Sequence, residues 1–590
     1  MIIQYLKVYC VYINIKTMGI PGFFGWLLRN YDKTFFTTYK INAQINELYI
    51  DANCLLHPSC FKVLNISDPT LHTKKVEDAM ITQCIQDIDN LIKYVNPTDK
   101  IFLAVDGVAP LAKISQQRKR RYKSYSDTVK KNEIKKIFNK PVTHSWTNAS
   151  ITPGTEFMEK LHIKLEQYLR SLTTPKNIIY SSYHTPGEGE HKIFDHIRKY
   201  EDNVTRVVYG LDADLIFLAM ACKKHNMFLI RETTAFIDQK QVIETPIPFV
   251  YVNIEALIYC FNELVYNMLE NTIRTTGKQI AYLRKNNVDD IIFICYFLGN
   301  DFIPHLPSID VKTSGMDMLL NAYVVAYTSN SLPLVITDNG KVQINVLFLN
   351  DFLAQLSIYE KEWFCCDKDA IRATRTPNYK GSSDPYDYEI WKLENMITIK
   401  STDVFKKYIG MFDDWKFRYY EHYFVSSESQ EQTIKNVCKN YIDGIMWIAK
   451  YYFGECPSWS WVYEYNCAPF VTDLNKFLQT YHYNVNNYVF HPDAPLQPIT
   501  QLLCVIPKAY SYLLPEQYAE LMQFDSQIGD MFPDDFDIDV CNKNMYWQCI
   551  PILPYLNIDR VIASTKKIKQ TPEMAILNNI SEHLIIVLTR

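Results

Sequence analysis

Short apolar runs alternate with amphipathic segments in the first half of the chain. Three such runs, 48–50 (LYI), 101–105 (IFLAV) and 206–211 (RVVYGL), each lead directly into an aspartate. Between the last two, the segment 155–172 places an apolar side chain at every fourth position, which predicts a helix. Strands and helices in alternation predict an α/β fold with a parallel sheet covered by helices on both faces.

The pattern changes in the second half. From about residue 336 onward, proline and aromatic residues become frequent and apolar runs ending in an acid stop. The sequence therefore predicts a boundary near 330–345, dividing a unit at 18–335 from a second region at 336–590. Within that region, the segment 376–388 (TPNYKGSSDPYDY) predicts a loop.

Composition narrows the class of protein. The chain has 590 residues, too many for one ordinary core, and 48% hydrophobic with 21% charged residues is typical of a soluble globular protein. Fifteen cysteines at scattered spacings favour free thiols over a zinc site or a disulfide framework. No apolar run is long enough to span a membrane, and residues 1–17 do not resemble a signal peptide. We therefore expect no membrane association.

Seven acidic residues lie at or near the ends of predicted elements. Three aspartates follow strands, one comes two positions later, two glutamates open a helix, and one aspartate ends a helical stretch. Ligands of parallel sheets bind at the carboxyl ends of the strands, so these acids would share one edge. A single acid there is more often a turn or cap residue, but seven converging carboxylates would need a counter-charge, and Mg²⁺ or Mn²⁺ would supply it. Two such ions can cleave a phosphodiester, so the spacing predicts a metal-dependent phosphoesterase. The seven acids are Asp51, Asp106, Glu188, Glu190, Asp212, Asp214 and Asp301.

A basic segment follows the second of these strands. The net charge is −4, yet the segment from Lys113 to Lys136 contains ten Lys or Arg residues and only two acids. In a helix, Lys113, Gln117 and Arg120 share one face, and Arg121 lies about 100° away. Such a cluster would prefer a terminal monophosphate, which carries more charge than an internal diester. The alternatives are a solvated helix face, a nuclear import signal at 118–121, and a general RNA-backbone surface at 130–136.

At these positions the sequence resembles the Xrn family of 5′→3′ exoribonucleases. The resemblance covers about residues 18–565, with none of the long carboxyl-terminal additions of the large cytoplasmic members, and indicates a compact member. Differences from the family pattern include Leu111, Ser115, Glu464, Asn466 and Cys467. The similar motifs are 18–24 (MGIPGFF), 51–57 (DANCLLH), 106–110 (DGVAP) with the basic residues after it, 151–158 (ITPGTEFM), 186–191 (PGEGEH), 209–215 (YGLDADL), 299–307 (GNDFIPHLP), 456–461 (CPSWSW), 468–470 (APF), 501–503 (QLL) and 534–536 (DDF).

The resemblance implies a role for each matching residue. The seven acids would hold two Mg²⁺ ions, or Mn²⁺, and form the catalytic centre. The 5′-phosphate would be bound by Lys113, Gln117, Arg120 and Arg121. His57 would stack on the terminal base against a tryptophan of the second region, either Trp459 or Trp461.

The resemblance also implies the fold and the activity. We expect a parallel-sheet domain related to flap nucleases, with a mainly helical second region enclosing the active site. The enzyme would act on single-stranded RNA with a 5′-monophosphate, processively and in mRNA decay. It would work as a cytoplasmic monomer, with a decapping enzyme as candidate partner.

The rival hypotheses are a flap DNA endonuclease and an inactive RNA-binding relative. Because the family-like start is at Met18, we expect residues 1–17 to be an extension that is untranslated or disordered.

Overall fold

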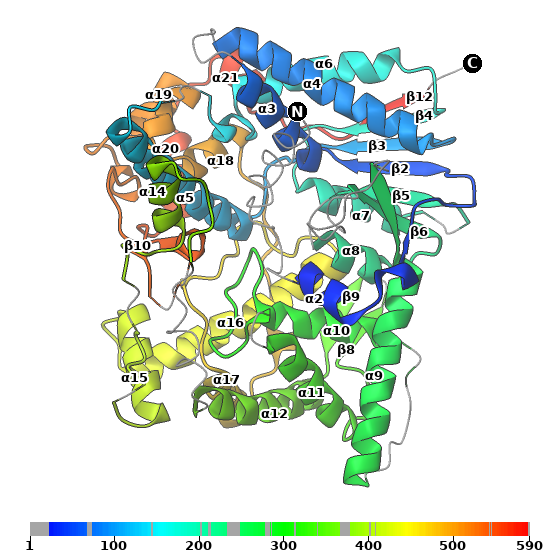
Figure 1. Ribbon diagram of the computed structural model, residues 1–590, viewed down its shortest axis with the longest axis vertical. Coiled ribbons are helices and arrows are strands. Elements are labelled where there is room, and N and C mark those ends of the chain that lie inside the picture. The colour runs from blue at the N-terminus through cyan, green and yellow to red at the C-terminus, as the bar shows by residue number, and fades with distance from the viewer. Residues whose placement is uncertain are drawn as a thin grey trace.

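The computed structural model describes residues 23–587, except for 68–72, 143–145, 201–202, 211–213, 233–247, 278–283, 285, 312–313, 339, 366–377, 401–402, 408, 542 and 544. Residues 1–17 and Asp212 therefore lie outside the described residues. Within the described part, eight strands form one sheet in the order β1-β7-β6-β5-β2-β3-β4-β12. The sheet occupies one end of the molecule, and helices fill the rest (Figure 1). The predicted α/β class is confirmed.

The five central strands are parallel, as predicted. Their register brings the ends of β2, β3 and β5 to one edge, because Asp51 lies opposite Ala104 and Ile50 lies opposite Tyr209. Strands β1, β7 and β12 run antiparallel to their neighbours at the two margins. The strands are β1 (Thr37–Thr38), β2 (Glu47–Asp51), β3 (Lys100–Ala104), β4 (Asn177–Ser181), β5 (Arg206–Tyr209), β6 (Met227–Glu232), β7 (Phe249–Asn253) and β12 (Leu584–Val587).

Both faces of the central strands are buried, which explains why these strands are mainly apolar. Successive side chains of a strand point to opposite faces, so Leu48 and Ile50 pack with one group of helices and Tyr49 packs with the other. The first group is α3 (Asn53–Ile66), α4 (Thr73–Val95) and α6 (Glu156–Ser171). The second group is α7 (Gly189–Arg198), α8 (Asp214–Cys222) and α9 (Ile254–Thr276), with α2 (Phe23–Asn30) beside it.

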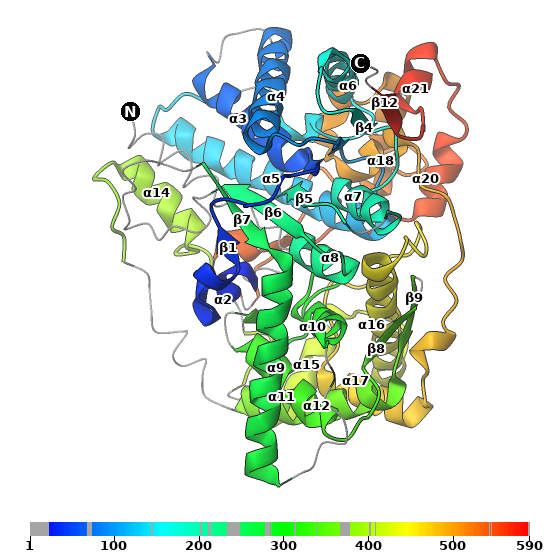
Figure 2. The ribbon, with the colours of Figure 1, turned by 90° about the vertical axis from the view of Figure 1, so that its right-hand side faces the viewer.

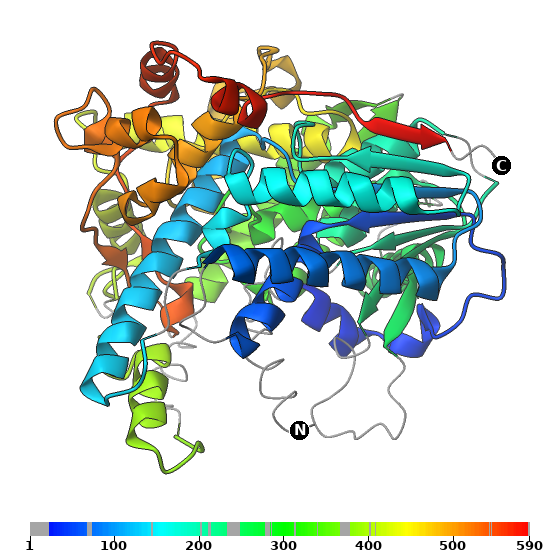
Figure 3. The ribbon, with the colours of Figure 1, turned by 90° about the horizontal axis from the view of Figure 1, so that it is seen from above.

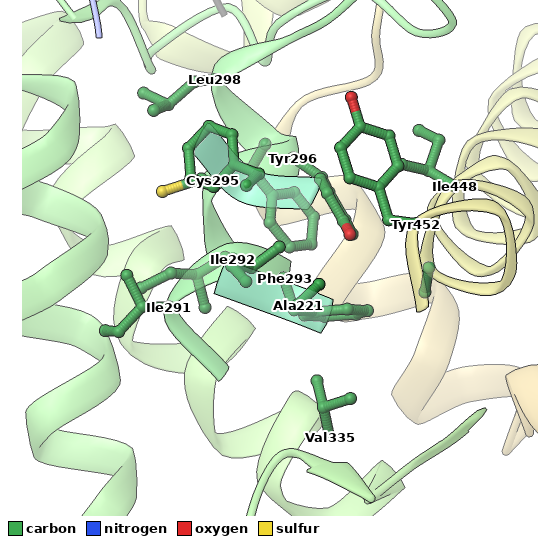
Figure 4. Close-up of a cluster of buried hydrophobic side chains, with 14 of the residues drawn as sticks. Ala221, Ile291, Ile292, Phe293, Cys295, Tyr296, Leu298, Val335, Ile448 and Tyr452 are labelled. Atoms are coloured by element: carbon green, nitrogen blue, oxygen red, sulfur yellow. The ribbon is translucent and has the colours of Figure 1, made fainter. Parts of the chain in front are cut away.

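The second face of the sheet shares its core with the helical region. Side chains from α8, α10, β8 and α16 meet there, and Tyr296 lies beside Tyr452 with ring centroids 5.4 Å apart (Figure 4). The two regions thus pack together directly at the sheet. The elements here are α10 (Val288–Cys295), the 3₁₀ turn η4 (Tyr296–Leu298), α11 (Gly315–Tyr327), β8 (Val335–Asp338), β9 (Lys341–Ile344), α12 (Val346–Cys365), α15 (Phe412–Tyr423), α16 (Gln430–Phe453) and α17 (Val471–Tyr481).

Helix α5 (Leu111–Ile137) connects the sheet to the rest of the molecule. Its first turns are buried among C-terminal helices, in a core that includes Leu111, Ile114 and Leu502. Its far end extends beyond the body, with α14 (Pro385–Glu394) beside it (Figure 3). Lys131 of α5 pairs with Glu394 of α14, and Lys140, just after α5, pairs with Asp384, just before α14. The C-terminal helices are α18 (Pro498–Val505), α19 (Glu516–Ala519), α20 (Ile558–Thr565) and α21 (Pro572–Leu577).

Two local features differ from the sequence prediction. The C-terminal segment returns to the eight-stranded sheet as β12, which pairs with β4 (Figure 2). The loop predicted at 376–388 is wrong from Pro385 onward, where α14 begins. Asp384 caps that helix by accepting a hydrogen bond from the Tyr386 N–H, and proline fits the first helical position because it needs no N–H there.

Candidate active site

The acids that follow the strands lie at the edge where β5, β2 and β3 end. Asp51 is the last residue of β2, Asp106 follows β3 by two residues, and Asp214 begins α8 shortly after β5. Asp51 and Asp214 are almost completely buried. The sheet order β5-β2-β3 therefore puts three predicted carboxylates on neighbouring strands.

Gly189 allows helix α7 to begin against two of these carboxylates. Its N–H donates to Asp106 Oδ1 over 2.7 Å. A Cβ at this position would lie 2.7 Å from Asp51 Oδ1 and 3.3 Å from Asp106 Oδ1, so no side chain fits without displacing an acid. The helix N-terminus, which carries a partial positive charge, thus faces the acidic centre. Asn53 also contributes, since its Nδ2 donates to Asp106 Oδ2 over 2.8 Å.

Lys113 is the positive charge inside this centre. Its ammonium lies 2.5 Å from Glu188 Oε2 and 2.7 Å from Asp301 Oδ2, and the side chain is buried. Burial opposes the charge on Lys113, but the neighbouring carboxylates, that of Asp301 foremost, raise its pKa well above the ordinary value. Lys113 is therefore positively charged, and it partly neutralises the acids.

Glu188 is reached from both regions of the chain. Burial raises its pKa, Lys113 opposes that shift, and the charges of Asp106 and Asp301 add to it. The hydroxyl of Tyr451, on α16, donates to Glu188 Oε1 over 3.0 Å. The Tyr451 ring in turn stacks on His191, with centroids 3.6 Å apart. The second region therefore orients one of the predicted catalytic acids.

The charges of the other acids also affect Tyr452, the residue that follows Tyr451 on α16. Burial raises the pKa of Tyr452 well above its ordinary value, and the charges of Asp214, Glu190 and Asp301 raise it further. The structure therefore brings six of the seven predicted acids together. The seventh, Asp212, lies outside the described residues, two positions before Asp214.

The donor set fits a hard divalent cation. The six side chains offer carboxylate oxygens, which Mg²⁺ and Mn²⁺ prefer, and the small cradle at Gly189 keeps two of them close together. In the described part of the chain, no group of three or more His, Cys, Asp or Glu side chains already has the arrangement of a metal site. Lys113 lies between two of the acids instead.

The predicted phosphate-binding residues lie along the buried part of α5. Gln117 and Arg121 are about nine-tenths buried. Gln117 Oε1 and Arg121 Nε and Nη1 have no hydrogen-bond partner within the residues that the structure describes. Burial and then the charge of Arg120 lower the pKa of Arg121 to about 9. Arg121 therefore has buried N–H groups that can donate hydrogen bonds to an anion.

Two contacts from the second region fix the start of α5. The Leu111 N–H donates to the Trp459 carbonyl over 2.7 Å, and the Ala109 N–H donates to Gln501 Oε1 over 2.8 Å. These bonds position the turn between Asp106 and Lys113. Gln501 belongs to a family-like motif, but its spacing gave no sign of this role.

His57 lies near the arginines of α5. Burial, followed by the charges of Arg120 and Arg121, lowers its pKa to about 3, so the imidazole is neutral at pH 7. A neutral ring avoids repulsion by the two guanidinium groups and keeps a flat apolar face. The structure therefore places His57 and the candidate phosphate site together.

The two candidate tryptophans have different surroundings. Trp461 is buried against Trp447, with ring centroids 5.4 Å apart, and packs closely on Gly444. Trp459 is only half-buried and lies over the start of α5. The Asp493 carboxylate accepts hydrogen bonds from the Trp459 and Ser460 N–H groups and so fixes this loop. Sequence reasoning missed Asp493, which lies in no recognisable motif.

The basic run 118–121 does not form an accessible import signal in this structure. Arg118 is buried and donates to the carbonyls of Pro554 and Met531. Burial lowers the pKa of Lys119 to about 8. The segment is helical and contributes to packing, so this alternative loses support.

Comparison with known proteins gives a consistent result. The family model described as the XRN 5′-3′ exonuclease N-terminus matches residues 18–233, and the Xrn1 helical domain model matches 282–408 and 411–589. The 5′-3′ exoribonuclease 2 of Candida albicans is 27% identical, with 93% of this chain and 72% of the relative covered. The enzyme of that name from Arabidopsis thaliana is 29% identical, covering 94% and 68%. Human 5′-3′ exoribonuclease 1 is 29% identical, covering 92% of this chain and 34% of its own length.

Proposed function

The chain belongs to the Xrn family of 5′→3′ exoribonucleases, and from this premise we propose that it degrades single-stranded RNA with a 5′-monophosphate, one nucleotide at a time, using divalent cations. The 5′→3′ exoribonuclease activity follows from the family and from relatives of that name. The 5′-monophosphate preference, the metals and the residue roles are the finer part of the proposal. The rival hypotheses of a flap endonuclease and of an inactive relative are not favoured.

One observation carries the finer part: a single helix joins the acidic centre to the buried arginine. Lys113 contacts Glu188 and Asp301, while Arg121, two turns further along α5, has buried donors without a partner among the described residues. Lys113 and Arg120 are seven residues apart, about 10 Å along the helix axis. Because one rigid helix fixes this separation, the chemistry would occur at a constant distance from the bound 5′ end. That arrangement predicts products of constant length.

The residues then have separable tasks. Asp51, Asp106, Glu188, Glu190, Asp214 and Asp301, with Asp212, would hold two Mg²⁺ ions, or Mn²⁺. Bound there, the ions would supply an activated water and stabilise the leaving oxygen. Gln117, Arg120 and Arg121 would bind the terminal phosphate together with Lys113. Tyr451 would keep Glu188 oriented, while His57 and Trp459 would hold the terminal base between two rings.

The proposal is tested by digesting one 3′-labelled RNA in Mg²⁺, offered with a 5′-monophosphate, a 5′-hydroxyl or a cap. We expect only the monophosphate RNA to be degraded, because the buried donors of α5 bind the doubly charged terminal phosphate most strongly. An Asp106→Asn variant should degrade none of them. Equal loss of all three RNAs would support an endonuclease, and loss of none would support a binding protein.

Base stacking is tested with Trp459→Ala and His57→Ala. Each substitution should raise the KM for phosphorylated RNA about tenfold or more, since stacking on an aromatic ring contributes about 1–3 kcal/mol per base. Phenylalanine at either position should restore most of the affinity. Trp547→Ala, which removes an exposed tryptophan outside the family-like motifs, is the matched control. An unchanged KM in Trp459→Ala would contradict the assignment.

The cellular setting is a separate matter. No helix in the described ranges is long and apolar enough to cross a bilayer. Cytoplasmic action in mRNA decay, as a monomer that receives substrate from a decapping enzyme, stays a prediction from the sequence. The domain boundary near 335 also stays a prediction.

A further inference from the structure

Lys113 has a single ammonium group, and both the substrate phosphate and the acidic centre would bind it. The proposed function assigns it to the 5′-phosphate of the substrate. In the structure the same ammonium contacts Glu188 Oε2 and Asp301 Oδ2, two acids proposed to bind metal. The side chain is 4% exposed, so solvent does not screen these contacts. The cation and Lys113 therefore compete for the same carboxylate oxygens.

A divalent ion and the ammonium cannot share these oxygens without strong repulsion. Mg²⁺ binds carboxylate oxygens at about 2.0–2.1 Å, and the ammonium is already within 2.7 Å of the same atoms. Both would then lie within a few ångströms of each other in a buried site, where like charges repel strongly. Metal binding must therefore move the ammonium away.

The displaced ammonium gains a new partner if it moves along helix α5 toward the candidate phosphate site. Lysine carries its charge on a flexible four-carbon stem, so the ammonium can shift while the helix stays fixed. Along the same helix lie Gln117 and Arg121, and the Nε and Nη1 donors of Arg121 have no partner within the described residues. A terminal phosphate bound there would offer the ammonium the negative charge that it loses to the metal.

We propose that Lys113 is a switch that makes cation binding and 5′-phosphate binding mutually dependent. Without metal, Lys113 neutralises Glu188 and Asp301. With metal, Lys113 is released to complete the phosphate site, and bound phosphate in turn keeps it away from the acids. The inference rests on the proposed function of this site. By linkage, phosphate must tighten metal binding by the same factor by which metal tightens phosphate binding.

The test measures Mn²⁺ binding from the electron paramagnetic resonance signal of the free ion at pH 8. The RNA carries phosphorothioate linkages that resist hydrolysis and ends in either a 5′-monophosphate or a 5′-hydroxyl. For the wild type, the monophosphate RNA should tighten Mn²⁺ binding about fivefold or more relative to the hydroxyl RNA, the lower end of usual coupling strengths. Lys113→Met should bind Mn²⁺ more tightly than the wild type without RNA and should show no difference between the two RNAs.

Two further variants make the result specific. Gln116→Met removes a neutral donor that lies 3.4 Å from Asp301 on the same helix, and it should behave like the wild type. Lys113→Gln keeps a hydrogen-bond donor and serves if Lys113→Met does not fold.

Unchanged or weaker Mn²⁺ binding by the folded Lys113 variant overturns the switch, even if degradation still requires a 5′-monophosphate. A wild type that binds Mn²⁺ equally with both RNAs also overturns it. Failure of the proposed function itself would instead appear as degradation that ignores the 5′ end.

Discussion

Replacing Glu188 with glutamine is expected to slow RNA hydrolysis by about a hundredfold to a thousandfold, the usual cost of removing one charge-stabilising group from an active site. The change removes a metal-binding charge and keeps the side-chain shape. Glutamine can still accept the Tyr451 hydrogen bond through Oε1. The loss should therefore lie in kcat, because the contacts of α5 to the 5′ end are untouched.

The same substitution should leave the metal-free protein at least as stable. Burial raises the folded-state pKa of Glu188 above its ordinary value. For an acid, this shift means that the folded state favours the protonated form, so the stability it confers is present at low pH and is lost as pH rises through the folded pKa. At neutral pH the uncharged glutamine removes this penalty. Lys113 loses one of its two partners, which limits the gain.

The measurement combines single-turnover degradation with thermal unfolding in the presence and absence of Mg²⁺. The wild type should be stabilised by Mg²⁺, and Glu188→Gln should be stabilised much less. Glu394→Gln is a matched control, since Glu394 also pairs with a lysine of α5 but at its exposed end. If Glu188→Gln keeps more than a tenth of the wild-type rate, Glu188 is not a catalytic acid.

The site could be predicted in outline because its acids are attached to strand ends. The position of a residue at the end of a buried strand is a local property, and parallel order then brings neighbouring strand ends together. This reasoning grouped Asp51, Asp106 and Asp212. Asp51 and Asp106 do lie together around Gly189, while Asp212 lies outside the described residues. Asp301 ends a helical stretch, so strand order alone says nothing about where it lies.

Contacts between distant segments could not be predicted in the same way. Tyr451 reaches Glu188 across 263 residues, and β12 adds four C-terminal residues to the sheet beside β4. An apolar run such as 584–587 (LIIV) has no local signal that names its partner. The choice between Trp459 and Trp461 likewise depends on which ring the core buries.

A difference from the family pattern also gained a physical explanation. Leu111 stands where the family commonly has a basic residue. In the structure it is buried in the core that α5 shares with α18. Its N–H still bonds the Trp459 carbonyl, so the start of the helix keeps its position. The change replaces a charge with packing and leaves the candidate phosphate-binding face of α5 intact.

Replacing Arg121 with methionine is expected to remove most of the preference for a 5′-monophosphate. Arg121 is about nine-tenths buried, and its Nε and Nη1 have no hydrogen-bond partner within the described residues. Hydrogen bonds to a charged group contribute about 1.5–3 kcal/mol each, so losing them should lower kcat/KM for the phosphorylated RNA about a hundredfold. The rate on 5′-hydroxyl RNA should hardly change, because that RNA offers no terminal phosphate.

The stability of this variant separates anion binding from a structural role. A buried charge without a partner destabilises a folded protein, so Arg121→Met should unfold at the same temperature as the wild type or higher. Arg118→Met is the matched control on the same helix. It leaves the Pro554 and Met531 carbonyls without their donor, so it should lower the unfolding temperature while keeping the 5′-phosphate preference. If Arg121→Met instead loses stability and keeps its preference, Arg121 is a packing residue and the 5′-phosphate is recognised elsewhere.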